Sequence, residues 1–198
     1  MIRSKYSEAF RALTKKEVFS SAEGREAGIP PRMLAYFCEK GQIEKICRGV
    51  YKIKTLDFDT AFEWEDLAIT ALSIPNGVIC LISALCYYGL TDEIMREFWI
   101  AVPHATTPPS RENARIIRMR NMSFGKTSVK IGSRKINIFD RERTVVDAFR
   151  YLDKEIALKA LQTYLKSGKE IKPDIDKLLR YAKRLRVDLT HYISAFTL

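Results

Sequence analysis

Residues 20–53 read SSAEGREAGIPPRMLAYFCEKGQIEKICRGVYKI, and this stretch decides the fold of the first part of the chain. Two serines precede a helix predicted over Ala22–Ala27, which Gly28 ends because glycine adopts a left-handed backbone at little cost. Two prolines then open a second helix, predicted over Pro31–Lys40, since proline suits the first helical position, and Gly41 is expected to end it. The pattern therefore predicts two helices joined by a tight turn.

A β-hairpin is predicted directly after the second helix. Residues 42–47 alternate in polarity, Arg48-Gly49 suits a turn, and Val50–Ile53 is a second β-rich run. Apolar residues at helical spacing also predict an earlier helix over Tyr6–Leu13. Together these elements predict a winged helix-turn-helix domain over residues 1–54, with the hairpin as the wing.

The second helix of such a domain buries one face and offers the other to the major groove of DNA. Leu34, Phe37 and Cys38 have the spacing of a buried face, and Arg32 near the start of the helix can read guanine through two hydrogen bonds. Basic residues on the wing and before the second helix can contact phosphate, and the wing can also enter the minor groove. The predicted DNA-binding residues are Arg32, Tyr36, Lys40, Lys45, Arg48, Lys52, Lys15, Lys16 and Arg25.

Charge is unevenly distributed along the chain, whose formal net charge is +10. Residues 55–95 contain no lysine or arginine, whereas the segments on either side are basic. A basic excess favours a polyanionic partner. A second basic surface is predicted over Arg111, Arg115, Arg118, Arg120, Lys126, Lys130, Arg134 and Lys135, with a solvated sheet face as the alternative explanation.

Residues 55–198 are predicted to form a second, mixed domain, which makes the whole chain α+β. Four strands are expected, over Glu97–Val102, Arg115–Met119, Thr127–Ile131 and Lys135–Phe139. Helices are expected over Glu63–Ser73, Ile82–Leu90, Glu142–Leu152 and Lys154–Ser167. A further helix is expected to begin at Pro173, and a last short one to follow Asp188. Asp140 is expected to cap the helix over Glu142–Leu152, and Asp153 the helix over Lys154–Ser167. Arg143 and Asp147, four residues apart on the first of these helices, are expected to form a structural ion pair.

Three segments of the chain resemble the AbiEi family of antitoxins. GREAGIPPRMLAYFCEKGQIEKICRGVYKI is similar to the winged helix of the family, LISALCYYGL to its Ser-Ala-Leu...Gly-Leu helix, and FDRERTVVDAFRY to its Glu-Arg-Thr...Asp segment. The resemblance implies a bacterial regulator without a catalytic site that represses its own operon by binding inverted repeats. It also implies that the protein counteracts a nucleotidyltransferase-like toxin encoded beside it. No family motif is found in Leu161–Leu198.

Two alternative functions are kept open. A stand-alone winged-helix regulator without a toxin would show the same N-terminal pattern. A DNA-acting nuclease could use Asp140, Glu142 and Asp147 as metal ligands, although Arg143 among them reduces their need for a cation.

Several other kinds of site are not supported by the sequence. No metal site or cofactor is expected, because the two histidines lie far apart and no cysteine has zinc spacing. Residues 67–91 lack charge, but Pro75-Asn76-Gly77 divides them, so no membrane span is expected. Four cysteines without a pairing pattern, and no export signal at the start, indicate a cytoplasmic protein.

Overall fold

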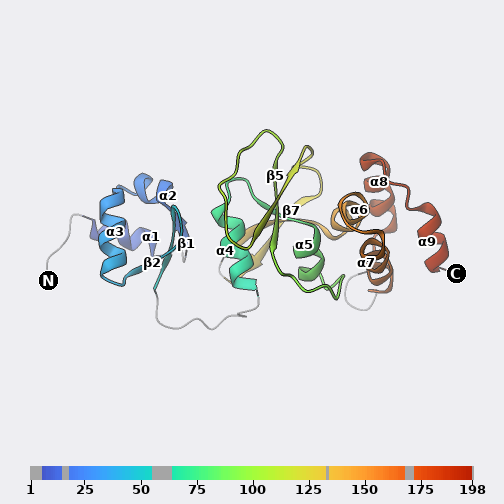
Figure 1. Cartoon of the computed structure of the whole chain (residues 1–198), viewed down its shortest axis with the longest axis horizontal. Coiled ribbons are helices and arrows are strands. Elements are labelled where there is room, and N and C mark those ends of the chain that lie inside the picture. The colour runs from blue at the N-terminus through green and yellow to red at the C-terminus, as the bar shows by residue number, and fades with distance from the viewer. Residues whose placement is uncertain (1–5, 15–17, 55–63, 133, 168–171, 198) are drawn as a thin grey trace. The chain divides into compact units, whose positions relative to one another are not determined.

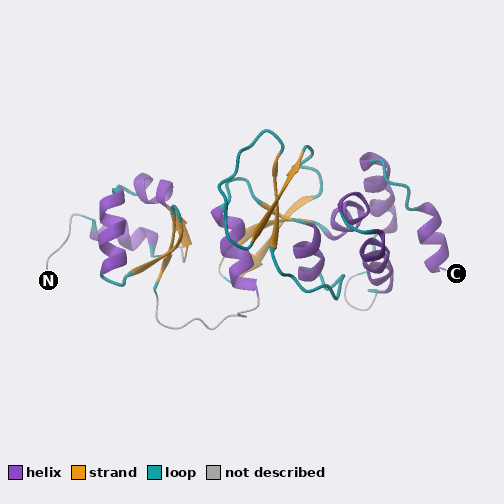
Figure 2. Cartoon of the chain, in the orientation of Figure 1, coloured by secondary structure: helices purple, strands orange, loops and turns teal. Residues whose placement is uncertain are grey.

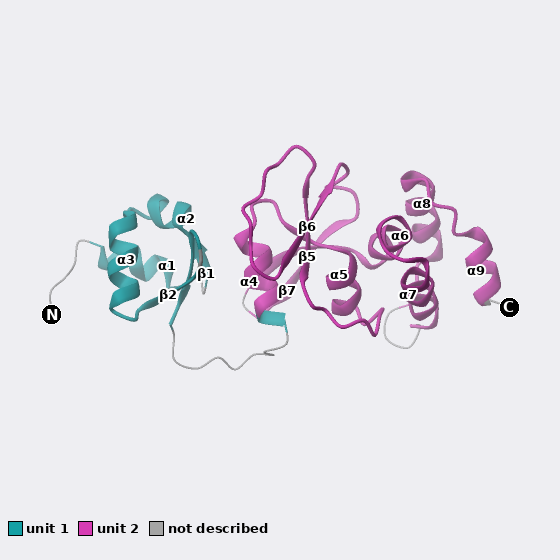
Figure 3. Cartoon of the chain, in the orientation of Figure 1, with its two compact units in different colours: residues 1–65 teal, residues 66–198 magenta. Residues whose placement is uncertain are grey.

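The computed structural model describes residues 6–14, 18–54, 64–132, 134–167 and 172–197. The chain divides into two compact units, unit 1 over residues 1–65 and unit 2 over residues 66–198 (Figure 3). Helices and strands occur in both units, which confirms the predicted α+β class (Figure 2). The domain boundary predicted after Lys54 adjoins residues 55–63, which lie outside the described residues.

Unit 1 contains the helices and the hairpin predicted from residues 6–53. Its helices are α1 (Ser7–Leu13), α2 (Ser21–Glu26) and α3 (Pro31–Glu39), and its strands are β1 (Val18–Ser20), β2 (Ile43–Cys47) and β3 (Val50–Ile53) (Figure 1). The strands form an antiparallel sheet in the order β1-β3-β2. Strand β1 was not predicted, because three residues are too few to show an alternating pattern.

Local interactions set the ends of α2 and α3. The Ser20 hydroxyl accepts a hydrogen bond from the Glu23 amide at 3.1 Å, and the Glu23 carboxylate accepts one from the Ser20 amide at 2.7 Å. This reciprocal capping box fixes the start of α2. Gly28 and Gly41 have φ values of +85° and +67°, as predicted for glycines that end a helix.

Helices α2 and α3 approach closely at Gly24. This glycine is buried, and a Cβ atom placed on it would lie 3.3 Å from Leu34 Cδ1 and 3.8 Å from the Phe19 ring. Leu34 is fully buried with Ile29 in the core of unit 1. Gly24 therefore allows α3 to pack directly on α2.

Unit 2 is a mixed sheet with helices around it and a helical C-terminal part (Figure 2). Its strands are β4 (Val78–Ile79), β5 (Phe98–Pro103), β6 (Ala114–Met119), β7 (Lys126–Ile131) and β8 (Arg134–Phe139). Its helices are α4 (Glu65–Ser73, whose first residue belongs to unit 1), α5 (Leu81–Tyr87), α6 (Arg141–Tyr151), α7 (Lys154–Lys166), α8 (Ile175–Leu185) and α9 (Thr190–Thr197).

The sheet of unit 2 has the strand order β6-β5-β4-β8-β7. Strand β4 lies at its centre, antiparallel to β5 and parallel to β8, with Ile79 opposite both Ile100 and Ile138. No strand was predicted here, because two buried residues in a continuous apolar run carry no periodic signal. The longer strands β5, β6, β7 and β8 were all predicted.

Helix α6 packs against α5, α7 and α8 and joins the sheet to the C-terminal helices. Asp140 caps it by accepting a hydrogen bond from the Arg143 amide at 2.9 Å, as predicted. Asp153 precedes α7 but makes no side-chain capping bond, so its predicted capping role is wrong. Helix α8 begins after Asp174 rather than at Pro173, since the Asp174 carboxylate accepts from the Lys177 amide at 2.8 Å.

None of the described helices is both long enough and apolar enough to cross a bilayer.

Substitution of Gly24 tests the close contact between α2 and α3. Gly24→Val should lower the free energy of unfolding of unit 1 by about 1–3 kcal/mol, because the added methyl groups overpack the space beside Leu34. Ala22→Val is the control, since Ala22 lies exposed on the same helix and should cost only about 0.5 kcal/mol through helix propensity. Urea unfolding followed by circular dichroism measures both. Equal losses for the two variants would contradict the packing role of Gly24.

Candidate nucleic-acid interface

Helix α3 divides into the two faces that its sequence predicts. Leu34 and Phe37 are buried, and Cys38 is half-buried. The opposite face is exposed to solvent and consists of Arg32, Ala35, Tyr36, Glu39 and Lys40. The first turn of the helix thus presents a guanidinium group, while the last turn presents one acidic and one basic side chain.

Tyr36 is the large aromatic residue on this exposed face, with 45% of its surface accessible. Its ring contacts Phe37 edge-on with 5.9 Å between centroids, and Lys40 Nζ lies 5.7 Å from the ring centre. Phe37 in turn packs on Phe10 of α1 at 4.4 Å. The exposed ring is therefore connected to the core of unit 1 and can present a flat apolar surface to a base or a sugar.

The β2–β3 hairpin corresponds to the predicted wing and carries three of the predicted DNA-binding residues. Lys45 and Arg48 are exposed, and Lys52 is partly buried. Lys45 pairs with Tyr51 and Cys47 with Val50, so Ile46 is an extra residue in a β-bulge. The hairpin therefore presents cationic side chains beside an irregular strand.

Ile46 was missed as a candidate interface residue. It is 37% exposed on the hairpin, where the bulge places it out of register with β3. Strict alternation along β2 gives no indication of a bulge. An exposed apolar residue on a wing can contact the sugar edges or the floor of a minor groove.

The other candidates of unit 1 have different outcomes. Arg25 lies exposed on α2, on the helix that precedes α3. Lys15 and Lys16 lie outside the described residues. Glu39 on α3 and Glu44 on β2 are also exposed, so the surface formed by α3 and the hairpin carries both charges. Any contact of this surface with DNA would therefore depend on where individual basic side chains lie.

The structure does not bring the second predicted basic set into one surface. Strands β6 and β7 are opposite edges of the five-stranded sheet, which separates Arg118 from Lys126 and Lys130 on β7. Lys135 is exposed on β8 beside β7, and Arg134 on the same strand is partly buried.

Two further arginines of this set are held by neighbouring groups. The Arg111 guanidinium donates to the hydroxyl and the backbone carbonyl of Ser73, both at 3.0 Å, which fastens the loop before β6 to α4. Arg115 stacks over the Trp99 ring at 4.3 Å. Both interactions explain the residues as structural elements of unit 2.

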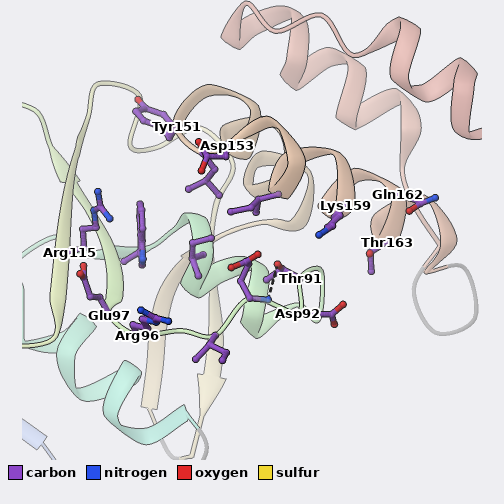
Figure 4. A pocket seen from close by; sticks show the side chains of 16 residues that line it. Thr91, Asp92, Arg96, Glu97, Arg115, Tyr151, Asp153, Lys159, Gln162 and Thr163 are labelled. Atoms are coloured by element: carbon purple, nitrogen blue, oxygen red, sulfur yellow. Dashed lines mark hydrogen bonds between the residues drawn. The ribbon is translucent and has the colours of Figure 1, made fainter.

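Figure 4 shows the pocket that Arg115 lines together with Glu97, Tyr151 and Lys159. The pocket has a volume of about 930 Å³ and belongs entirely to unit 2. Acidic side chains (Asp92, Glu93, Glu97 and Asp153) are interspersed with basic ones (Arg96, Arg115 and Lys159) around it. This mixture of charges gives the pocket no clear preference for an anion or a cation.

The predicted ion pair between Arg143 and Asp147 is confirmed. Arg143 Nε lies 2.6 Å from Asp147 Oδ2, and each side chain is only 1% exposed. Arg143 Nη1 also donates to the carbonyls of Asn121 and Phe124, at 3.2 and 2.9 Å. A second cation also pairs with Asp147, since Arg150 Nη1 lies 2.7 Å from Asp147 Oδ1. The pair thus ties α6 to the segment between β6 and β7.

The remaining carboxylates of the nuclease alternative are also engaged by a cation. Lys177 Nζ lies 3.1 Å from Asp140 Oδ2 and 2.7 Å from Glu142 Oε2. Burial alone would lower the pKa of Lys177, but its hydrogen bonds to Glu142 and Asp140 outweigh this and raise the pKa above its usual value. Glu142 also accepts from the Tyr164 hydroxyl at 2.8 Å. Within the described ranges, no group of three or more histidine, cysteine or acidic residues is arranged to hold a metal ion.

Two helices joined by a tight turn and followed by a hairpin are the arrangement used by winged helix-turn-helix regulators. Residues 8–53, from α1 to the end of β3, match the model of a family described as "Transcriptional regulator, AbiEi antitoxin". The resemblance predicted for the N-terminal region is therefore confirmed. The two later segments that resemble the family lie outside the matched residues. No curated protein gives a significant match to the chain.

Arginine substitutions should separate base reading from phosphate contact. Arg32→Ala should weaken binding to the DNA upstream of the protein's own gene by about 1–3 kcal/mol, because a bidentate base contact carries sequence information. Its affinity for DNA of random sequence should hardly change. Arg48→Ala should weaken both and reduce the slope of log affinity against log salt by about one, as loss of a phosphate contact does. Fluorescence anisotropy at several salt concentrations measures both effects.

Two controls accompany these variants. Arg11→Ala removes an equal charge from the exposed face of α1 and should leave affinity for the upstream DNA nearly unchanged. Tyr36→Ala should change affinity without changing the salt slope. If Arg32→Ala reduced binding to both DNAs equally while circular dichroism showed intact folding, α3 would not be the reading helix.

Proposed function

We propose that the protein is a DNA-binding transcriptional regulator that represses its own operon. The observation that carries this proposal is the exposed face of α3, which presents Arg32 and Tyr36 within the residues that match a family of transcriptional regulators. The proposed role of α3 is to read base edges in the major groove, and that of Lys45 and Arg48 is to contact the flanking backbone. The net charge of +10 favours association with DNA.

Two copies of the protein are expected to act together on an inverted repeat. One recognition helix contacts only a few base pairs, which gives too little specificity for a single operator. Cooperative binding of a dimer to a pair of half-sites doubles the number of base pairs that are read and so supplies the missing specificity. This expectation rests on the family resemblance and on the small size of unit 1.

The second part of the proposal is that the protein is an antitoxin. The description of the matching family includes this role, and the resemblance implies a nucleotidyltransferase-type toxin encoded in the same operon. We assign the antitoxin activity to unit 2, because unit 1 is already accounted for by DNA binding. We place the protein in the cytoplasm, where Cys38, Cys80 and Cys86, which are unbridged in the structure, would remain reduced.

A stand-alone regulator is the second candidate. The family match ends at residue 53, so it supports a regulatory role for unit 1 and does not extend to unit 2, to which the antitoxin activity is assigned. A regulator without a toxin fits this pattern as well. The neighbouring gene distinguishes the two functions. If its product arrests growth when expressed alone, and growth returns when this chain is co-expressed, the antitoxin assignment is supported.

Footprinting tests the proposed autoregulation. DNase I protection of the region upstream of the gene should appear as two equal segments related by inverted symmetry, with their centres one or more helical turns apart. Both segments should become protected over the same narrow range of protein concentration. A shuffled sequence of identical composition is the control. Protection of one unrepeated segment, or of none, would contradict the proposal.

A further inference from the structure

An arginine-rich hollow in unit 2 is separate from the proposed DNA-reading face. It has a volume of about 560 Å³, within the range of small-molecule sites. We call it the arginine pocket, and its cationic lining residues are Arg118, Arg120, Arg143, Arg150, Arg184 and Arg186. These come from β6 and the turn after it, from α6, and from the end of α8. No acidic residue of the described chain lines the pocket, in contrast to the pocket of Figure 4.

Three of these arginines carry a charge that no described residue neutralises. Within the described residues, the side chains of Arg118, Arg120 and Arg186 form no ion pair or hydrogen bond, and all three are exposed. Like charges gathered around one hollow repel one another. Arg186 is 66 residues from Arg120 and 68 from Arg118 in the sequence. A bound anion therefore explains why these three arginines line one pocket better than a contribution to stability does.

The other arginines are held in place by their neighbours. Arg150 is fixed by Asp147 at 2.7 Å, and Arg184 stacks over the Phe124 ring at 4.3 Å. Phe124 itself packs on Tyr181 of α8 at 4.3 Å. These contacts reduce the conformational freedom that the guanidinium groups would lose when a ligand binds.

Buried Arg143 retains hydrogen-bonding capacity. Its Nε and Nη1 donate to the Asp147 carboxylate and to two carbonyls. Among the described residues, Nη2 donates only to the Met119 sulfur, at 4.0 Å. A thioether is a weak acceptor. Met119 and Arg143 both line the arginine pocket. The Nη2 group of Arg143, which has only a weak acceptor among the described residues, therefore belongs to the pocket wall.

We propose that the arginine pocket binds a small anion with two or more phosphate groups, such as a nucleoside diphosphate or triphosphate. Planar guanidinium groups match phosphate oxygens in pairs, and several of them are needed to balance a polyphosphate. Tyr151 also lines the pocket and is 40% exposed, and the Arg150 guanidinium lies 5.0 Å from the centre of its ring. The pocket wall therefore includes an aromatic surface beside the arginines, which suits a ligand that carries a base. This ligand site goes beyond the proposed function and does not require DNA binding by α3.

Isothermal titration calorimetry of the full chain tests the proposal. Inorganic pyrophosphate and ATP should each bind at one site per chain, and orthophosphate should bind more weakly because it reaches fewer arginines. Arg118→Ala and Arg186→Ala should each raise the dissociation constant about tenfold, the effect of losing one charge-assisted hydrogen bond. Neither side chain has a partner in the described protein, so both variants should fold normally, which circular dichroism checks.

The control variant is Arg180→Ala. Arg180 is exposed on α8 and does not line the pocket, so its loss removes the same charge and should change affinity less than about twofold. Absence of binding, or equal losses for Arg180→Ala and Arg118→Ala, would overturn the proposal. Displacement of ATP by a random 20-base-pair duplex, with the duplex requiring Arg118 equally, would also overturn it by assigning these arginines to a nucleic-acid surface. None of these outcomes depends on whether Arg32 reads DNA.

Discussion

The close approach of α2 and α3 at Gly24 is the constraint on which unit 1 depends. Any side chain larger than hydrogen at this position would press on Leu34, a fully buried residue of α3. With Leu34 seated there, the orientation of α3 about its axis is fixed, and Arg32 and Tyr36 face solvent on the opposite side. The proposed reading of DNA thus depends on a contact between Gly24 and Leu34, neither of which is among the proposed DNA-binding residues.

Most of unit 1 could be predicted because its signals are local. Ser20, Gly28 and Gly41 each act through the backbone of a few neighbouring residues, and the spacing of Leu34 and Phe37 gives the buried face of α3 directly. The importance of Gly24 and the exposure of Ile46 could not be predicted in this way. The first depends on a contact between two helices and the second on a bulge in strand pairing, and neither leaves a periodic pattern in the sequence.

Unit 2 shows the same limit more strongly. The ion pair of Arg143 and Asp147 was predictable, since four residues separate its members on one helix. The central strand β4 and the arginine pocket were not, because they depend on tertiary contacts between distant segments. Arg118 was expected to share a surface with Lys130, yet strand order places them on strands at opposite edges of the sheet. Arg118 instead lines the arginine pocket, as Arg186 does.

Photo-crosslinking tests most directly whether α3 and the β2–β3 hairpin contact DNA. The full chain is bound to a bromodeoxyuridine-substituted duplex from the region upstream of its gene, and the crosslinked peptides are mapped by mass spectrometry. We expect crosslinks in residues 31–40, with Tyr36 prominent because the residue is 45% exposed, and in residues 43–53. Crosslinks confined to residues 66–198, with none in α3, would contradict this expectation.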